Sequence, residues 1–367
     1  MFQRPTILVI AFFLVLVLPS TSTANPQLGM RTAPKLDKIE AELGKRLFFD
    51  RRLSVNGTLS CAMCHIPEQG FTQNQMATPV GFKGRSVKRN SPTLLNVAYR
   101  QVLFFDGREF TLHDQVWSPL LSAREMGNVS IGSVIARLQQ LDDYASVFRQ
   151  VYGEDITAGN IGAALAAYEQ TLIAAGSPFD QWYFGKLDSA VGDGVKSGFA
   201  LFMRHGCIQC HTVDASQGQF TDDDFHNTGI GFARTMQDPV RGTRIIKLAE
   251  TISIQTEESF EGDNLNDLGR YEMTGHTGDR WKYRTPTLRN VALTSPYMHD
   301  GSLSSLEDVI SFYADGGVPN EGLDDKIKPL NLTRIEISQL VLFLQSLTSP
   351  HVQDLIEAAR SVQIGDY

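Results

Sequence analysis

The sequence predicts a mainly α-helical chain with two domains, and three observations support this fold class. Apolar residues recur at helical intervals ahead of two copies of one short motif, at 61–65 and 207–211. An Ala-rich helical pattern at 161–176 lies between the copies and stops before Ser177-Pro178. Segments that alternate apolar and polar residues, as strands do, are few. A chain of 367 residues is long enough for two domains of ordinary size.

The first 24 residues are typical of an export signal. Arg4 precedes an apolar run from Ile7 to Leu18, and Ser22-Thr23-Ala24 resembles a small-residue cleavage site. The run is shorter than the roughly 20 residues of a membrane-spanning helix, although a retained anchor stays an alternative. We therefore expect export to the periplasm, with no membrane span after cleavage of the signal.

The expected organisation follows from these signals. Beyond the signal peptide at 1–24, we expect an N-terminal domain at 25–185, a C-terminal domain at 186–350 and a C-terminal tail at 351–367. The formal net charge of −8 argues against nucleic acid as a partner, because nucleic-acid binding relies on a basic face. The same charge would suit a basic protein partner.

The helical segments can be placed in chain order. Apolar residues at helical intervals precede each motif: Leu36, Ile39, Leu43 and Leu47 before the first, and Val195, Phe199 and Phe202 before the second. We expect a linker around 177–194 between the domains. Further helices are expected at 305–317, closed by Gly316-Gly317, and at 333–347.

All four cysteines of the chain lie in the two short motifs. The first motif contains Cys61, Cys64 and His65, and the second contains Cys207, Cys210 and His211. Cys-x-x-Cys-His is the attachment signature of c-type haem, in which the thiols bond the haem vinyl groups and the histidine binds the iron. A thioredoxin-like redox pair, a zinc site and two short-loop disulfides are the alternatives. Two motifs that use every cysteine favour two cytochrome c-like helical domains, each around one covalently bound c-type haem.

Several longer stretches follow one another in a fixed order along the chain. They are "LGKRLFFDRRLS", "RNSPTLLNVAY", "FFDGR", "EMGN", "SPFDQW", "YRTPTLRNVALTSPYMHDGS" and "LEDVISFY". In these stretches the sequence resembles the bacterial dihaem cytochrome c peroxidases, and it is closer to the MauG-type enzymes among them. The resemblance covers nearly the whole chain after the signal. It implies a peroxidase-class oxidoreductase whose first haem is the one that meets peroxide.

The resemblance also implies the residues around the first haem. Members that need reductive activation carry a distal histidine in the loop after the first motif, whereas 66–89 contains none here. His65 would therefore hold one face of the iron and leave the other open to peroxide. Glu125 corresponds to the family's distal acid and Gln115 to its distal glutamine, and Pro119 would line the same pocket. Without the resemblance, Glu125 next to a basic residue would be an ordinary surface carboxylate.

For the second haem the resemblance implies His211 as the proximal ligand and Tyr313 as the sixth ligand. Tyrosine occupies that position in MauG, and methionine in typical dihaem peroxidases. A phenolate favours ferric iron and lowers the reduction potential. Met273, Met298 and Tyr297 are nearby alternatives, in which case Tyr313 would be a packing residue.

A calcium ion between the haems is also implied by the resemblance. Its ligands would be the side chain of Asn90 and the backbone carbonyls of Thr294 and Pro296, with waters completing the oxygen coordination that calcium prefers.

Two positions depart from the family pattern. Phe105 stands where typical members have a tryptophan that relays electrons between the haems, so hopping through this position is in doubt. His205 stands where MauG has a tryptophan that serves as an exit site. A distant protein substrate would then need another exit, through Trp182 or Trp281.

Two functions follow from these expectations. The first is cleavage of hydrogen peroxide at the first haem, with electrons supplied through the second haem by a small cytochrome c, a copper protein or a residue of a protein substrate. The alternative is a dihaem electron carrier without peroxide turnover, which would have two six-coordinate haems and no need of Glu125.

Overall fold

The computed structural model describes residues 25–364, except for 26, 238–241, 250–251 and 259–266. The expected signal peptide at 1–24 lies outside the described residues. The described helices are joined by long loops and short single turns, with little strand, which confirms the prediction of a mainly α chain. None of the helices in these ranges is long and apolar enough to cross a membrane.

The N-terminal half is built on two long helices that cross each other. Its helices are α1 (Lys38–Phe49), α2 (Leu112–Gln115), α3 (Trp117–Leu121), α4 (Ile131–Gln139), α5 (Asp142–Tyr152) and α6 (Ala158–Gln170). Asp37 precedes α1, and its carboxylate caps the first turn of the helix, which buries Leu43, Leu47 and Phe48. At the crossing with α6, a side chain on Gly44 would lie 1.7 Å from the Ala164 carbonyl oxygen, so only glycine allows this approach.

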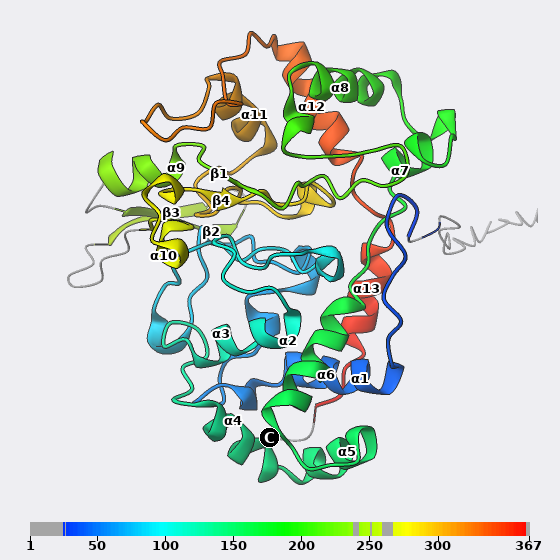
Figure 1. Ribbon diagram of the computed structural model, residues 1–367, viewed down its shortest axis with the longest axis vertical. Helices are drawn as coiled ribbons and strands as arrows, with labels where there is room; N and C mark the ends of the chain where they lie inside the picture. Colours follow the sequence, from blue (N-terminus) through cyan, green and yellow to red (C-terminus); the bar gives the residue numbers. More distant parts are fainter. Residues whose placement is uncertain (1–24, 26, 238–241, 250–251, 259–266, 365–367) are drawn as a thin grey trace, which may run out of the picture.

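The C-terminal half repeats this arrangement with a second pair of crossing helices (Figure 1). Its helices are α7 (Pro178–Tyr183), α8 (Asp193–Arg204), α9 (Ile230–Phe232), α10 (Tyr271–Thr274), α11 (Leu306–Ala314) and α12 (Arg334–Gln345). α8 packs on α12, and Phe179, Phe202 and Phe343 are central to the core between them. Phe179 belongs to α7, so packing places this helix with the C-terminal half. The expected domain boundary at 185/186 lies after α7. The residues that precede α7 in the chain contribute to the N-terminal core, and α7 itself packs in the C-terminal core.

The expected C-terminal tail contains a helix that returns to the N-terminal half. α13 (Val352–Arg360) buries Val352 and Ala359 in the N-terminal core, and Arg360 forms an ion pair with Glu68 at 2.8 Å. Figure 1 shows α13 running down beside α6 and α1. The last helix therefore completes the core that the first helices began.

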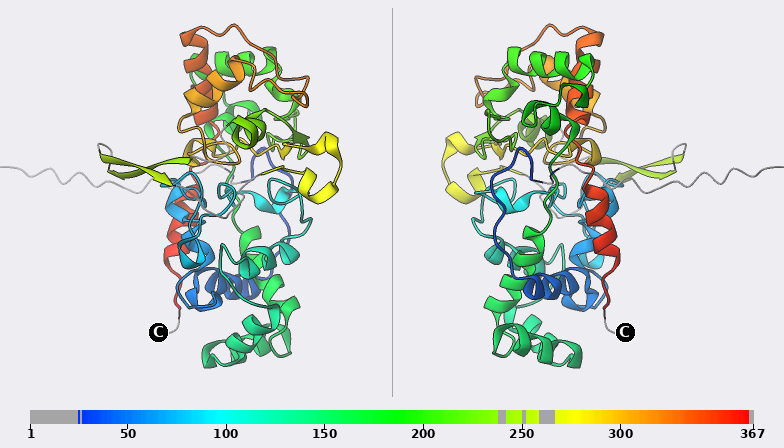
Figure 2. Two further views of the ribbon diagram at one scale, coloured as in Figure 1. Left: turned by 90° about the vertical axis from the view of Figure 1, so that its left-hand side faces the viewer. Right: turned by 90° about the vertical axis from the view of Figure 1, so that its right-hand side faces the viewer.

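Four short strands complete the described structure. β1 (Phe225–His226) pairs antiparallel with β4 (Tyr283–Arg284) between the two halves. β2 (Gly242–Ala249) and β3 (Ile252–Glu258) form an antiparallel hairpin, with Gly242 opposite Glu258, that projects from the body in the side views (Figure 2). The sequence analysis did not predict this hairpin.

Candidate active site

Both Cys-x-x-Cys-His motifs fold into the same turn. Cys61–Met63 and Cys207–Gln209 are single 3-10 turns, and each brings the following histidine back over the first cysteine. The His65 amide donates to the Cys61 carbonyl at 2.9 Å, and the His211 amide donates to the Cys207 carbonyl at 3.0 Å. All four cysteines are free, so no disulfide closes either turn.

The two histidines are held in the orientation that an iron ligand needs. Nδ1 of His65 lies 3.1 Å from the carbonyl oxygen of Phe71, and Nδ1 of His211 lies 2.9 Å from that of Phe220. An Nδ1–H that donates to a carbonyl leaves Nε2 as the ligand atom. Burial lowers the pKa of His65 to about 4 and also lowers the pKa of His211, which keeps both rings in the neutral, metal-binding form.

A repeated segment supports each histidine, and the sequence analysis did not recognise the repeat. Residues 89–98, RNSPTLLNVA, match residues 283–292, YRTPTLRNVA. In the first copy the Thr93 hydroxyl donates to the Gly70 carbonyl at 2.6 Å, and in the second the Thr287 hydroxyl donates to the Gln219 carbonyl at 2.5 Å. Each acceptor immediately precedes the phenylalanine that faces the histidine. The shared letters P-T-L-x-N-V-A were the available signal.

Glu125 lies in a tight turn after α3 that faces the first motif. Its amide donates to the Ser122 carbonyl at 3.0 Å, and the next amide, of Met126, donates to the Pro119 carbonyl at 3.1 Å. Burial raises the pKa of Glu125, and a hydrogen bond with Ser122 opposes the shift. Burial also raises the pKa of Cys64 to about 12, and the Glu125 carboxylate adds to that shift. Burial thus acts on both groups, and the charge of Glu125 acts on the Cys64 thiol.

The other expected distal residues lie on the neighbouring short helices. Gln115 is the last residue of α2 and Pro119 lies in α3, and both are half-buried. No hydrogen bond joins the Gln115 and Glu125 side chains in the part of the chain described. His113, on the same short helix as Gln115, is engaged elsewhere, because its ring nitrogens lie 2.9 Å from Asp114 and 3.0 Å from the Gly159 carbonyl.

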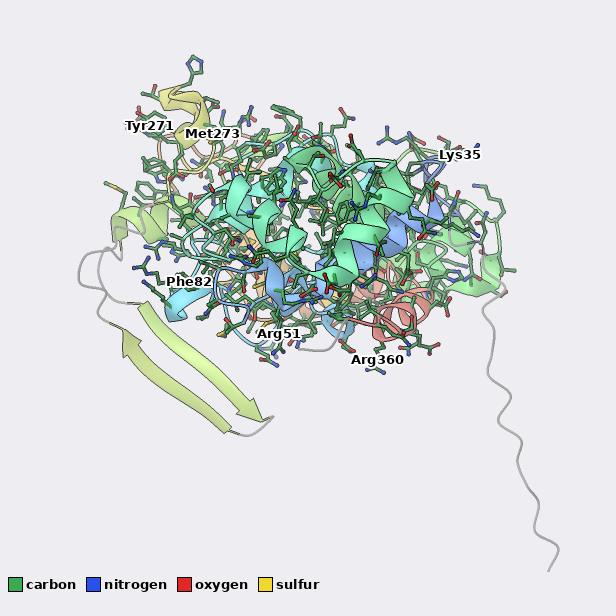
Figure 3. The ribbon with its side chains drawn as sticks, turned by 90° about the horizontal axis from the view of Figure 1, so that it is seen from below. Lys35, Arg51, Phe82, Tyr271, Met273 and Arg360 are labelled. Atoms are coloured by element: carbon green, nitrogen blue, oxygen red, sulfur yellow. The ribbon has the colours of Figure 1, made fainter. Side chains whose placement is uncertain are left out.

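Tyr313 on α11 faces the second motif. Burial raises the pKa of its phenol, and the Cys210 and Cys207 side chains add to the shift, so the phenol lies close to both thiols. Two of the alternatives are placed differently. The Tyr297 hydroxyl donates to the Val291 carbonyl at 3.2 Å, and Met273 is 51% exposed at the outer edge of the molecule (Figure 3). Met298 is half-buried and remains the methionine alternative.

His226 stands beside the second motif and was missed by the sequence analysis. Its Nε2 lies 2.9 Å from Asp222 and its Nδ1 lies 2.5 Å from Asp324. The hydrogen bond with Asp222 is the main cause that raises the pKa of His226 to about 11. The charged ring therefore ties the loop after Cys210 to the loop after α11. The only signal in the sequence for this contact is the spacing of four residues between Asp222 and His226.

Comparison with known proteins agrees with this geometry. The family model described as di-haem cytochrome c peroxidase matches residues 38–188. The methylamine utilization protein MauG of Methylorubrum extorquens is 36% identical over 322 residues, which cover 86% of this chain and 80% of the relative. The cytochrome c551 peroxidase of Nitrosomonas europaea is 32% identical over 311 residues, covering 84% and 79%. The chain belongs to the di-haem cytochrome c peroxidase family.

Solved structures show the same architecture. A MauG-like protein associated with microbial copper homeostasis is 28% identical, with a TM-score of 0.70, over 87% of this chain and 91% of the other. The diheme peroxidase BthA from Burkholderia thailandensis shares the fold, with a TM-score of 0.72 at 24% identity and 91% coverage of both chains. As a member of the family, the protein is an oxidoreductase of the peroxidase class with two haem cofactors.

The layer between the two halves of this di-haem peroxidase contains the expected calcium residues. The Asn90 side chain donates through Nδ2 to the Pro296 carbonyl at 2.6 Å, and its Oδ1 accepts from the Ser91 amide at 2.7 Å. Thr294 lies two residues before Pro296, at the end of the short turn Val291–Leu293. Its hydroxyl donates to the Val291 carbonyl at 3.0 Å. The structure thus brings Asn90 and Pro296 together from opposite halves.

Phe105 also lies in this layer. Its carbonyl accepts from the Arg284 amide at 2.8 Å, which joins the N-terminal half to β4. Next to it, Tyr283 stacks on His299 with ring centroids 3.5 Å apart. Arg89 links the halves further through its ion pair with Asp267 at 2.7 Å, and it also pairs with Asp106 of its own half at 2.6 Å.

The residues considered as exits lie at different edges of the C-terminal half. His205 caps the end of α8, and in the part of the chain that the structure describes its buried Nε2 has no hydrogen-bond partner. Trp182 packs edge-on against Phe179 at 5.7 Å, within the aromatic core. Trp281 packs against Phe232 with ring centroids 5.1 Å apart, and within the described ranges its buried indole nitrogen has no hydrogen-bond partner.

Proposed function

We propose that the protein cleaves hydrogen peroxide at an open first haem and receives the electrons through a His/Tyr-ligated second haem. One observation carries the proposal. In both motifs the histidine Nδ1 lies against the carbonyl oxygen of a phenylalanine. The group that acts on the buried thiol of the first motif is a carboxylate, Glu125, whereas the group that interacts with the thiols of the second motif is a buried phenol, Tyr313. This asymmetry fits one reactive centre and one electron-transfer centre. A pair of equivalent carrier haems would not require it.

The motifs fit c-type haem on their own geometry. Each offers two free thiols and a neutral imidazole whose Nδ1 is already engaged. Cys61, Cys64 and His65 would hold the first haem, and Cys207, Cys210 and His211 the second. The bound haem supplies the redox chemistry of peroxide cleavage.

Glu125 has the environment of a group that moves a proton. Peroxide cleavage needs a proton taken from one oxygen and delivered to the other, and a carboxyl group does both best when its pKa lies near the working pH. Burial shifts the pKa of Glu125 in that direction. The Ser122 hydrogen bond fixes the orientation of the carboxyl group. Gln115 and Pro119 would complete the pocket wall.

Tyr313 would give the second haem the character of a low-potential centre. A phenolate oxygen is a hard, anionic donor that stabilises ferric iron, whereas a methionine thioether raises the potential. This ligand supports a place in the MauG branch.

Asn90, Thr294 and Pro296 would bind calcium between the halves. A half-turn of the Asn90 amide exchanges Nδ2 and Oδ1 within the same volume, and it would place an oxygen where Nδ2 now meets the Pro296 carbonyl. Oxygen-only coordination completed by waters is typical of calcium. The ion would hold the two halves in fixed register.

The electron donor would be a small redox protein (a cytochrome c or a copper protein) or an oxidisable residue of a protein substrate. The acidic net charge of −8 favours a basic partner. An N-terminal export signal would place the reaction in the periplasm. A protein substrate would have to be reached by a route other than His205, through Trp182 or Trp281.

The electronic spectrum and electron paramagnetic resonance of the ferric protein test this function against the electron-carrier alternative. The proposal predicts one high-spin component from an open first haem and one low-spin component from the second. Two low-spin haems would contradict it and favour the carrier.

A further inference from the structure

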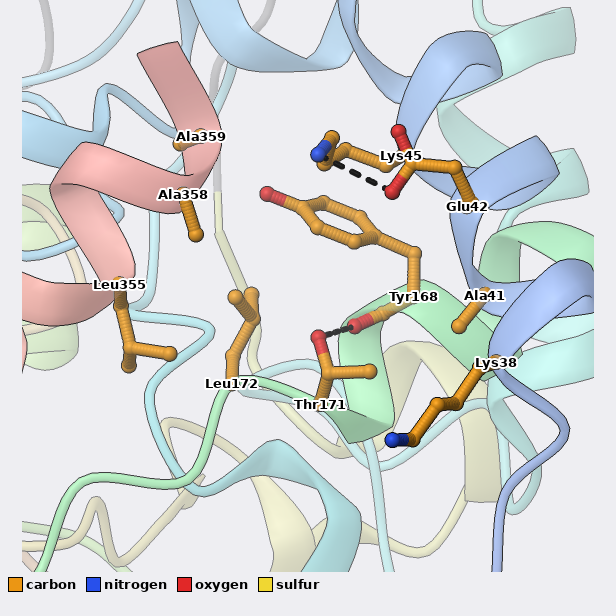
Figure 4. Close-up of a pocket in the computed structure, with 10 residues that line it drawn as sticks. All are labelled: Lys38, Ala41, Glu42, Lys45, Tyr168, Thr171, Leu172, Leu355, Ala358 and Ala359. Atoms are coloured by element: carbon orange, nitrogen blue, oxygen red, sulfur yellow. Dashed lines mark hydrogen bonds and ion pairs between the residues drawn. The ribbon is translucent and has the colours of Figure 1, made fainter. Parts of the chain in front are cut away.

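A surface pocket opens between three helices of the N-terminal half, on the side away from the second motif. The pocket has a volume of about 260 Å³ and lies between α1, α6 and α13 (Figure 4). Lys38 and Lys45 lie on one side, and Leu172, Leu355 and Ala358 form apolar walls. Tyr168 forms the floor.

Tyr168 directs an unpartnered hydroxyl into this pocket. The residue is 4% exposed, and its buried Oη has no hydrogen-bond partner among the described residues. Figure 4 shows the hydroxyl pointing into the open space between Lys45 and Ala358. A buried hydroxyl without a partner is costly, so a group that supplies a partner there would bind favourably.

The other side of Tyr168 leads to the first motif. Its ring packs on Phe48 with centroids 5.1 Å apart, and Phe48 lies 6.5 Å from the His65 ring. Burial is the largest cause that raises the pKa of Tyr168, and the carboxylates of Glu169 and Glu42 add to it. The Cys61 thiol makes a smaller contribution, so it is also near. An oxidisable phenol thus lies one aromatic ring away from the expected iron ligand.

We propose that this pocket binds a small phenolic acid, which delivers electrons to the first haem through Tyr168 without using the second haem. The inference rests on the proposed function, because peroxide at the first haem is the oxidant. It adds a second class of reductant and a second entry point for electrons.

The pocket chemistry selects this class of ligand. A single aromatic ring fits a volume of this size between Leu172, Leu355 and Ala358. A phenolic hydroxyl can exchange a hydrogen bond with Tyr168 Oη at the floor. A carboxylate at the opposite end of the ring would meet the exposed Lys38 at the mouth, whereas the buried Lys45, beside the Tyr168 hydroxyl, is paired with Glu42 at 3.1 Å.

The redox step balances with this ligand. Tyr168 delivers one electron inward through Phe48 and its hydroxyl proton to water in the pocket. It then takes one electron and one proton from the bound phenol, which leaves as a phenoxyl radical. Two phenols supply the two electrons and two protons that convert one hydrogen peroxide into two waters.

Binding is tested first, with the holoprotein and a ligand that cannot react. Veratrate (3,4-dimethoxybenzoate) has the ring and carboxylate but no phenolic O–H. We expect calorimetric titration to show one site, and Ala358→Phe to weaken binding by about tenfold or more, because the new ring fills the pocket. Ala358 is exposed, so this substitution leaves the fold intact. Unchanged veratrate affinity in Ala358→Phe, or no binding to the wild type, overturns the proposed site.

Turnover is tested next, with hydrogen peroxide and vanillate (4-hydroxy-3-methoxybenzoate). For each variant the vanillate rate is divided by the rate with reduced cytochrome c. We expect Tyr168→Phe to lower this ratio by about tenfold or more, veratrate to inhibit only the vanillate reaction, and the control Tyr183→Phe to leave the ratio within about twofold. A ratio that is unchanged in Tyr168→Phe overturns the electron route.

This design separates failure of the inference from failure of the proposed function. If the peroxide-induced change of the first haem spectrum occurs but vanillate turnover is independent of Tyr168, only the inference fails. If peroxide produces no change at all, the proposed function fails as well.

Discussion

Asn96 and Asn290 donate from opposite halves of the molecule to one acceptor, the carbonyl oxygen of Ala174, at 2.9 and 3.1 Å. Both asparagines have left-handed backbone conformations, with φ of 62° and 60°, at equivalent places of the repeated segment. Each segment also supports the histidine of one Cys-x-x-Cys-His motif. The shared acceptor therefore fixes the relative position of the two motifs through a single buried backbone group.

We predict that Asn96→Ala destabilises the protein strongly. The variant loses the bond to the Ala174 carbonyl and the one that Oδ1 accepts from the Ala174 amide at 2.8 Å, and it leaves both groups buried. The expected loss is about 2–5 kcal/mol in the free energy of unfolding by denaturant. Asn74→Ala, at an exposed position, is the control and should change it by less than about 0.5 kcal/mol. An equally small change in Asn96→Ala would show that Ala174 does not join the halves.

Covalent attachment of two haems is predicted from the two free cysteine pairs. The intact mass of protein matured in an export-competent host should exceed the processed polypeptide by two haem masses. Cys207→Ser with Cys210→Ser should remove one haem mass and leave the first site loaded. A wild-type mass equal to the bare polypeptide contradicts both haem assignments.

Glu125→Gln should slow peroxide cleavage and leave both haems attached. General acid–base assistance typically contributes about 10²–10⁴-fold, and the amide can neither accept nor return the proton. Stopped-flow absorbance after mixing with peroxide gives the rate. Glu321→Gln, an exposed carboxyl group, is the matched control. A Glu125→Gln rate within about twofold of the wild type would move the proton-transfer role to another group.

Glu169 makes stability depend on pH in a direction that the structure sets. The side chain is 5% exposed, its Oε2 has no hydrogen-bond partner among the residues described, and burial raises its pKa from 4.5 to about 8. The unfolded chain releases this proton at lower pH than the folded protein does. Stability should therefore fall as pH rises from about 4.5 to 8, by up to about 1.4 kcal/mol per pH unit.

Glu169→Gln removes that contribution, because the amide stays neutral at every pH. The variant should be more stable than the wild type at pH 8, and the advantage should shrink towards pH 5. Denaturant unfolding at several pH values provides the measurement. An advantage that is the same at both ends of this range would mean that Glu169 does not titrate in the folded protein.

Tyr313→Phe should change the spectrum of the second haem and raise its reduction potential, because an anionic oxygen donor is lost. The wild-type ferric spectrum should show no methionine-to-iron charge-transfer band. Tyr297→Phe is the control, since that hydroxyl donates to the Val291 carbonyl. If Tyr313→Phe leaves spectrum and potential unchanged, Tyr313 is a packing residue, and Met298→Leu becomes the test of the ligand.

The two Cys-x-x-Cys-His motifs could be recognised from the sequence because their pattern is local. Cysteine spacing and the adjacent histidine define each motif, and the apolar spacing before it predicts α1 and α8. Glu125 and Tyr313 required the family resemblance, since a single carboxylate or phenol has no local pattern. The structure adds that each lies near the thiols of one motif.

Other features depend on contacts that no local pattern reveals. The apolar spacing of Val352, Leu355 and Ala359 is helical, but it does not show that α13 joins the N-terminal core. Phe179 follows Ser177-Pro178, and this sequence is typical of a linker. Only its contacts with other aromatic residues show that it belongs to the C-terminal core. The hairpin β2–β3 projects from the body in the side views and was not among the predicted elements.

Addition of one equivalent of hydrogen peroxide to the fully oxidised protein tests the central claim most directly. The loop 66–89 has no histidine to close the first haem, and His113 is held by Asp114 and the Gly159 carbonyl. We predict that the first haem reacts at once, without prior reduction, and that its spectrum changes in the stopped-flow record. A spectrum that stays unchanged until one electron is supplied would contradict the open site.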